Sequence, residues 1–147
     1  MSVKEELMRW LDANEYDVFL TVTLKKSNIS NDGTHTKITD ADVEKVARFM
    51  RNNITRRLCG RRRRLNFAPF VERSSDGRLH LHILFSNPRG VPIHKLNTIC
   101  NSVVKKNEWT AQQWDVKGVY DKSHLLSYCL KTGSSAFIPE GCSVQVK

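Results

Sequence analysis

Two apolar segments joined by a short polar loop constrain the fold of this chain more than any other feature of its sequence. Residues 66–72 and 78–86 are rich in apolar side chains, and the segment 74–77 between them ends in Asp-Gly. An Asp-Gly pair in such a position is a strong signal for a β-hairpin. With a three-residue loop, Glu72 lies directly opposite His80 on one face, whereas a two-residue loop would not align them. The sequence therefore predicts two antiparallel strands that bring Glu72 and His80 together.

The spacing of apolar residues predicts the other strands and helices. Further strands are expected at 16–25 and 109–120, with a last short strand in the tail 134–147. Helices are expected from Thr39 or Asp40 to about Leu58, from Pro92 to about Lys106, and from Asp121 or Ser123 to Lys131. The order β-α-β-β-α-β-α fits one α+β domain, 1–147, with a ferredoxin-like split βαβ fold. We expect a central antiparallel sheet with helices packed on one face, and a loop at 26–37.

The excess of basic residues indicates nucleic acid as the partner. The chain has 24 Lys and Arg against 15 Asp and Glu, a net charge of +9, and such an excess usually binds a polyanion. We expect the basic segment at the end of the first predicted helix to follow the DNA backbone, with a solvated loop as the alternative. Its arginines are Arg56, Arg57, Arg61, Arg62, Arg63 and Arg64. No apolar run approaches the ~18 residues that a membrane span requires, so no membrane partner is expected.

Two histidines in the second hairpin strand form a candidate metal site. Because strand side chains alternate, His80 and His82 leave the same face, roughly 7 Å apart at their Cα atoms. Together with Glu72 they would make a three-ligand site with open positions, which is the arrangement of a catalytic metal. The alternatives at this point are two surface histidines and a solvated carboxylate.

A tyrosine on the last predicted helix is a candidate nucleophile. Tyr128 and Lys131 lie on the side of that helix opposite its apolar residues. A cation one turn away favours the phenolate of tyrosine and can also neutralise a phosphate. An ordinary Tyr-Lys pair on the surface is the alternative.

Three short motifs, taken in order, resemble those of HUH endonucleases, specifically rolling-circle replication initiators. They are FLTVTL at 19–24, HLH at 80–82 and YCLK at 128–131. The resemblance covers about 16–133 and implies the same split βαβ fold. It implies that His80 and His82 are metal ligands with Glu72 as the third, that Tyr128 is the single nucleophile, and that Lys131 assists it.

The resemblance also implies an activity. In such enzymes Mg²⁺ or Mn²⁺ polarises a phosphate of single-stranded DNA while tyrosine attacks, which leaves a 3′-hydroxyl and a 5′-phosphotyrosine. A free 3′-hydroxyl can then rejoin the strand. Two imidazoles suit Mn²⁺ better than Mg²⁺. The location would be cytoplasmic in a prokaryotic host and nuclear for a eukaryotic virus.

Other interpretations of the sequence remain open. The chain has no GxxxxGK[ST] loop, so a separate helicase is expected unless the chain is the nuclease part of a longer protein. A single-tyrosine transposase of the same superfamily typically supplies a glutamine as the third ligand. A non-catalytic binder could stack bases on Phe67, Phe70 and Phe85, but it would have no use for two histidines and a carboxylate.

Overall fold

A four-stranded antiparallel sheet forms the centre of the computed structural model, which describes residues 2–60 and 65–138. Its strands lie in the order β4-β5-β1-β6. Their bounds are β1 (Val18–Leu24), β4 (Phe67–Arg73), β5 (Leu79–Phe85) and β6 (Thr110–Gly118). All four lie within or close to the predicted segments. The structure thus confirms the predicted α+β class and the ferredoxin-like split arrangement.

The hairpin of β4 and β5 has the predicted register. Glu72 pairs with His80 across the two strands. The backbone N–H of Ser74 donates to the carbonyl of Arg78 over 2.9 Å, which closes a three-residue loop. Gly77 ends that loop at a φ of +83°, a conformation that glycine adopts without steric cost. The loop chemistry of the sequence therefore fixes which side chains face each other.

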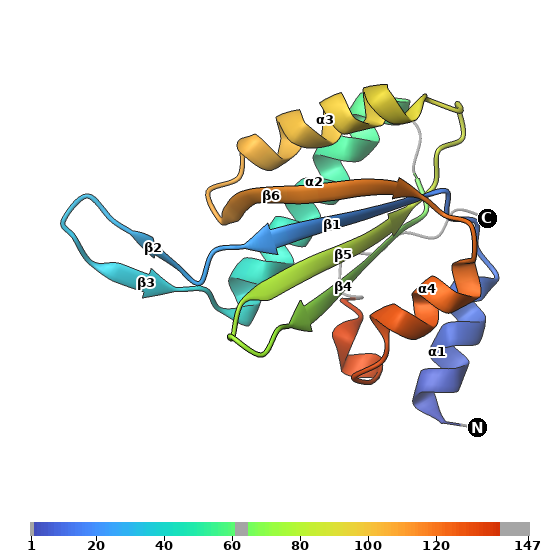
Figure 1. Ribbon diagram of the computed structural model, residues 1–147, viewed down its shortest axis with the longest axis horizontal. Helices are drawn as coiled ribbons and strands as arrows, with labels where there is room; N and C mark the ends of the chain where they lie inside the picture. The colour runs from blue at the N-terminus through green and yellow to red at the C-terminus, as the bar shows by residue number, and fades with distance from the viewer. Residues whose placement is uncertain (1, 61–64, 139–147) are drawn as a thin grey trace.

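Two predicted helices cover one face of the sheet (Figure 1). They are α2 (Asp40–Cys59) and α3 (Ile93–Lys105). Thr39 caps α2: its hydroxyl accepts from the N–H of Asp42, and the Asp42 carboxylate accepts from the N–H of Thr39. Alternate residues of the strands, such as Val22 and Leu81, are fully buried under these helices. This face is the larger part of the hydrophobic core.

Helices lie on the second face as well, so the prediction of helices on one face only is wrong. The helices are α1 (Val3–Asp12), which was not predicted, and α4 (Lys122–Cys129), which Asp121 caps. They gather beside one end of the sheet (Figure 1), where they bury Phe70 and Leu84. Toward the other end, the same face carries Glu72 and His80. Glu72 and His80 are polar and only half-buried, so this part of the face is less covered than the apolar end.

The segment predicted as a loop at 26–37 contains a small hairpin. Its strands are β2 (Ser27–Ile29) and β3 (His35–Lys37), and it projects away from the main sheet (Figure 1). Of the tail in which a last strand was predicted, the described residues form a 3₁₀ turn, Ser134–Ala136, and one bridge between Phe137 and Phe70. The rest of the tail lies outside the described residues. No helix in the described parts of the chain is long and apolar enough to cross a membrane.

Candidate active site

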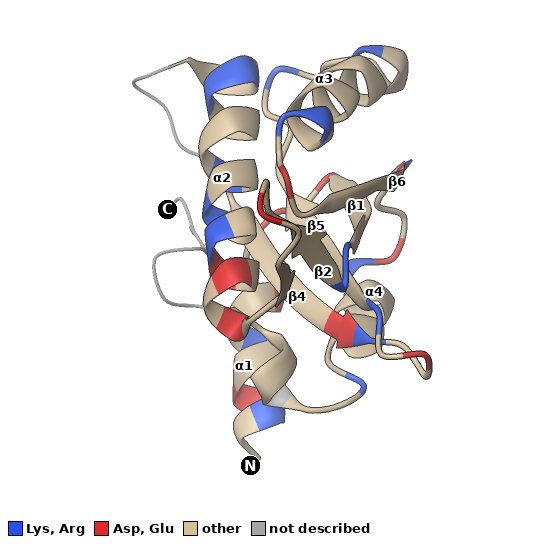
Figure 2. Ribbon diagram, turned by 90° about the vertical axis from the view of Figure 1, so that its left-hand side faces the viewer, with Lys and Arg blue, Asp and Glu red and all other residues tan. Residues whose placement is uncertain are grey.

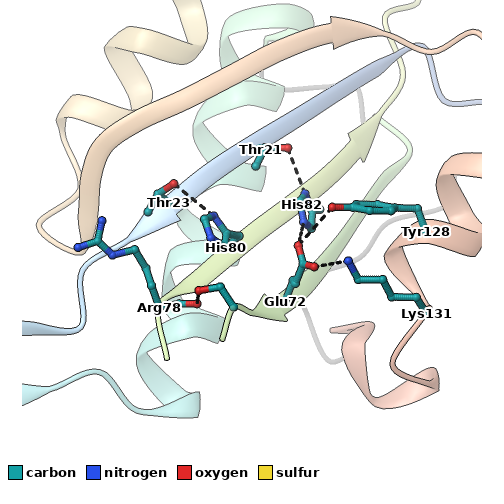
Figure 3. Close-up of polar contacts among 9 residues, drawn as sticks. Thr21, Thr23, Glu72, Arg78, His80, His82, Tyr128 and Lys131 are labelled. Carbon is teal, nitrogen blue, oxygen red and sulfur yellow. Dashed lines mark hydrogen bonds and ion pairs between the residues drawn. The ribbon is translucent and has the colours of Figure 1, made fainter. Parts of the chain in front are cut away.

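The two histidines of β5 lie on the second face of the sheet, where His82 is buried and His80 is half-buried, and each contacts a threonine of β1. Thr21 pairs with His82 and Thr23 pairs with His80 in the strand register. The Thr21 Oγ1 is 3.1 Å from His82 Nδ1, and the Thr23 Oγ1 is 3.3 Å from His80 Nδ1 (Figure 3). Both imidazole rings therefore use one nitrogen to bind β1.

These two threonines are site residues for which the sequence alone predicted no role. The signal was present, because residues two apart on a strand share a face, and the antiparallel register brings a Thr-x-Thr segment against a His-x-His segment. A hydroxyl on Nδ1 fixes the orientation of the ring and thereby decides where Nε2 points. For His82, Nε2 points toward β4.

Glu72 of β4 is the centre of the polar contacts. Its Oε1 is 2.7 Å from His82 Nε2 and accepts from the Tyr128 hydroxyl over 3.5 Å. Its Oε2 forms an ion pair with the Lys131 ammonium. Burial raises the pKa of Glu72, but hydrogen bonds from His82 and Lys131 and their charges outweigh this effect and lower the pKa to about 2. The carboxyl group is therefore ionised at neutral pH.

The contact between Glu72 and His82 defines the tautomer of His82. Burial of the ring lowers the pKa of His82 despite the opposing effect of Glu72, which favours a neutral imidazole. The short contact needs one proton, and the ionised carboxylate cannot supply it. His82 therefore carries its proton on Nε2 and donates to Glu72, while its Nδ1 accepts from the Thr21 hydroxyl.

Tyr128 and Lys131 approach this group from α4 and the turn after it (Figure 3). The Tyr128 ring meets the His82 ring edge-on at 5.6 Å, and the side of His82 toward β1 stacks on Phe19 at 5.5 Å. The Lys131 Nζ lies 4.2 Å from the centre of the Tyr128 ring. The bond to Glu72 is the main reason that the pKa of Lys131 is raised, so the ammonium stays charged. Tyr128 itself is 40% exposed and within reach of a ligand.

The structure thus brings four of the five predicted catalytic and metal-binding residues into direct contact. Glu72, His82, Tyr128 and Lys131 form this group, which we call the tyrosine cluster. His80 lies beside it on the same strand face and contacts Thr23. The cluster can offer a phosphate a cation and a phenol in one place, with the His80 ring beside them.

Comparison with known protein families assigns the chain to one of them. A model of the family described as Replication-associated protein ORF2 matches residues 17–133, a range that includes every residue of the tyrosine cluster and both threonines. The chain belongs to this replication-associated protein family. Neither the curated proteins nor the solved structures gave a match. The resemblance to replication initiators is therefore confirmed at the level of this family.

Two of the predicted DNA-binding arginines, Arg56 and Arg57, lie away from the tyrosine cluster in this replication-associated protein. Arg56 and Arg57 are exposed near the end of α2, and the Arg57 guanidinium donates to the Ser102 hydroxyl of α3. Figure 2 shows basic residues at several points along α2, which covers the face of the sheet opposite the tyrosine cluster. Arg61, Arg62, Arg63 and Arg64 lie outside the described residues. The structure does not bring Arg56 and Arg57 to the cluster.

The aromatic side chains considered for base stacking are not available on the surface of this family member. Phe67, Phe70 and Phe85 are fully buried. They belong to the two hydrophobic clusters on either face of the sheet. The alternative in which these three residues stack bases is therefore wrong.

Proposed function

We propose that this replication-associated protein nicks and rejoins single-stranded DNA through a covalent 5′-phosphotyrosine bond made by Tyr128. The observation that carries the proposal is the tyrosine cluster, in which the exposed phenol of Tyr128 lies against a charged lysine, an ionised glutamate and a histidine. Tyr16 is buried and Tyr120 is not in the cluster. The match to a replication-associated family supports initiation of replication over transposition.

The reaction is an in-line exchange of phosphate esters. The Tyr128 oxygen forms a bond to the scissile phosphorus, and the bond from phosphorus to the 3′-oxygen breaks. The phenol loses its proton, and the departing 3′-oxygen gains one. The Lys131 ammonium, 4.2 Å from the centre of the Tyr128 ring, is placed to stabilise negative charge on the phosphate. In the reverse direction a 3′-hydroxyl attacks the phosphotyrosine, so the strand is rejoined without ATP.

A divalent cation, Mn²⁺ or Mg²⁺, would be held by His80, His82 and Glu72. The chemistry of the donors fits, because two imidazoles and a carboxylate share one strand face and suit Mn²⁺. Among the described residues, however, no group of three such side chains is already disposed to hold a metal ion. His82 and Glu72 are already in contact, so a cation would have to replace the proton between them, and His80 contacts Thr23 instead of this pair. When bound, the ion would polarise the scissile phosphate.

The proposal is tested with a library of single-stranded hairpins incubated with the protein and Mn²⁺. Wild type is expected to give a species that resists denaturant and carries the 5′ end of the downstream fragment; sequencing of the trapped ends identifies the cleavage site. A separate helicase would be needed to expose such a strand in duplex DNA. If the products carry free 5′-phosphates and no protein, water is the nucleophile and the proposal is wrong.

A further inference from the structure

A cavity lies next to the tyrosine cluster on the same face of the sheet. Its volume is about 470 Å³, and Phe19, Lys117, Tyr120, His124 and Leu125 are among the residues that line it. Phe19 and Lys117 are partners in the register of β1 and β6. The volume falls in the range of sites that hold small organic groups.

Two contacts connect this cavity to the proposed nucleophile. The Phe19 ring stacks on His82, so the same side chain borders both the cluster and the cavity. His124 lies one turn before Tyr128 on α4, the helix that follows β6 (Figure 1), and it lines the cavity. Side chains four residues apart on a helix are neighbours. A nucleotide in the cavity would therefore be close along the strand to a phosphate at Tyr128.

The lining has the chemistry that a nucleotide requires. Tyr120 is 98% exposed, and its ring lies 4.0 Å from the place that a Cβ on Gly118 would take. An exposed aromatic ring beside a cavity can stack a base, because every base has a π-face. Asp121 also lines the cavity, but its carboxylate accepts the N–H of His124 as the cap of α4.

Lys117 supplies a cation for the phosphate of such a nucleotide. Its side chain is 69% exposed, and its Nζ is 3.5 Å from the carboxylate of Asp115. Surface ion pairs of this kind contribute little to stability. Lys117 can therefore exchange Asp115 for a DNA phosphate at little cost.

We infer that this cavity binds one nucleobase next to the scissile phosphate, stacked on Tyr120, with Lys117 on the adjoining phosphate. The inference rests on the proposed function and names a base-binding site within it. The fit of one base between Phe19, Tyr120 and His124 would then contribute to the choice of DNA sequence.

The test is a scan with abasic sites in the Tyr128→Phe background, which prevents cleavage. Oligonucleotides selected from the single-stranded library by their binding carry one abasic position each, and fluorescence anisotropy measures their affinity. We expect one position beside the scissile phosphate to lose roughly tenfold in affinity. Adding Tyr120→Ala should lower the affinity for the intact strand by a similar factor. It should also remove the loss of affinity caused by the abasic site at that position. Lys117→Gln should lower the salt slope of single-strand binding by roughly 0.7, the value for one phosphate contact.

Trp10→Ala is the matched control, because Trp10 is another exposed aromatic residue and packs on Phe137 outside the cavity. It should leave the abasic pattern unchanged. An abasic pattern that is identical with and without Tyr120→Ala would overturn the inference even if wild type forms the covalent adduct. If Tyr120→Ala removes the sensitivity at one abasic position but wild type forms no adduct, the base site is supported and the proposed nuclease activity is rejected. A protein that binds no single strand would reject both.

Discussion

At the scale of single residues, the hydroxyl of Thr21 is suited to two states of His82. In the structure the neutral ring carries its proton on Nε2 for Glu72, and Thr21 donates to Nδ1. Binding a metal through Nε2 requires that nitrogen to be free of its proton, so the ring proton must lie on Nδ1. A threonine hydroxyl can then accept instead of donating. Thr21 can thus hold the ring in place in both states.

Replacing Thr21 is expected to weaken metal binding without removing a ligand. Thr21→Val keeps the shape of the side chain and loses the hydroxyl, so the affinity for Mn²⁺ should fall by roughly 10- to 100-fold. Thr21→Ser should restore it. Titration calorimetry with Mn²⁺ alone measures both variants. Equal Mn²⁺ affinity in wild type and Thr21→Val would show that the threonine does not position His82.

The ionised Glu72 is expected to make stability depend on acid pH. Its pKa is about 2 in the folded chain against an ordinary value of 4.5, so its contribution is present above pH 4.5 and is lost as the pH falls toward 2. Glu72→Gln should reduce the loss of unfolding free energy over this range by about 1 kcal/mol, after allowance for solvent screening. Urea unfolding at several pH values measures the difference. Other carboxylates with lowered pKa values affect both proteins alike, so parallel pH profiles would contradict the assignment.

At the scale of helices and strands, α1 and α4 support each other on the second face of the sheet. Leu11 of α1 is fully buried in the cluster that includes Leu126 and Leu130. The Lys122 ammonium also donates to the carbonyls of Asp12 and Asn14 at the end of α1. The position of Tyr128 therefore depends in part on a helix that contributes no residue to the tyrosine cluster.

Removing the buried side chain of α1 is expected to cost stability. Leu11→Ala should lower the free energy of unfolding by about 2–5 kcal/mol, because it leaves a cavity under α4. Val3→Ala on the exposed side of the same helix is the matched control and should change it little. Urea unfolding distinguishes the two. A similar small effect for both variants would mean that α1 is not docked.

The parts of the fold that depend on local chemistry could be predicted from the sequence. The hairpin register followed from its loop, and α2 and α3 followed from caps and apolar spacing. The features that could not be predicted depend on contacts between residues that are far apart in the sequence. The helix α1 is short and highly charged; Ser2 caps it, but its place in the fold depends on packing against α4 and Phe137. Likewise, HLH and Tyr128 could be identified as separate candidates, but the bonds from Glu72 to His82 and Lys131 arise from the meeting of β4, β5 and the end of α4.

At the scale of the whole molecule, basic residues lie on both faces of the sheet. Lys131 serves the tyrosine cluster, whereas Arg56 and Arg57 lie on α2 across the sheet. A single strand that contacts both must pass around an edge of the sheet. The net charge of +9 favours such a path, because phosphate contacts dominate non-specific affinity.

The arginines on α2 are expected to contribute to affinity for all sequences alike. Replacing Arg56 and Arg57 by Gln should weaken single-strand binding evenly and reduce the salt slope by roughly 0.7 for each phosphate that is no longer neutralised. Lys4→Gln on α1 is the control for loss of charge alone. Binding measured across a range of salt concentrations gives the slope. An unchanged slope would place α2 away from the DNA and contradict the prediction for this segment.

The central claim is that Tyr128 becomes covalently bound to DNA. The direct measurement is mass spectrometry of peptides from the adduct formed with Mn²⁺ and a cleavable strand, in wild type and in Tyr128→Phe. This change removes one hydroxyl from a half-exposed ring, so the fold should survive and binding can be checked separately. We expect a nucleotide mass on the peptide that contains Tyr128 in wild type, and no adduct in Tyr128→Phe. An adduct that persists in the variant, or a modified peptide that contains Tyr16 or Tyr120 instead, would contradict the claim.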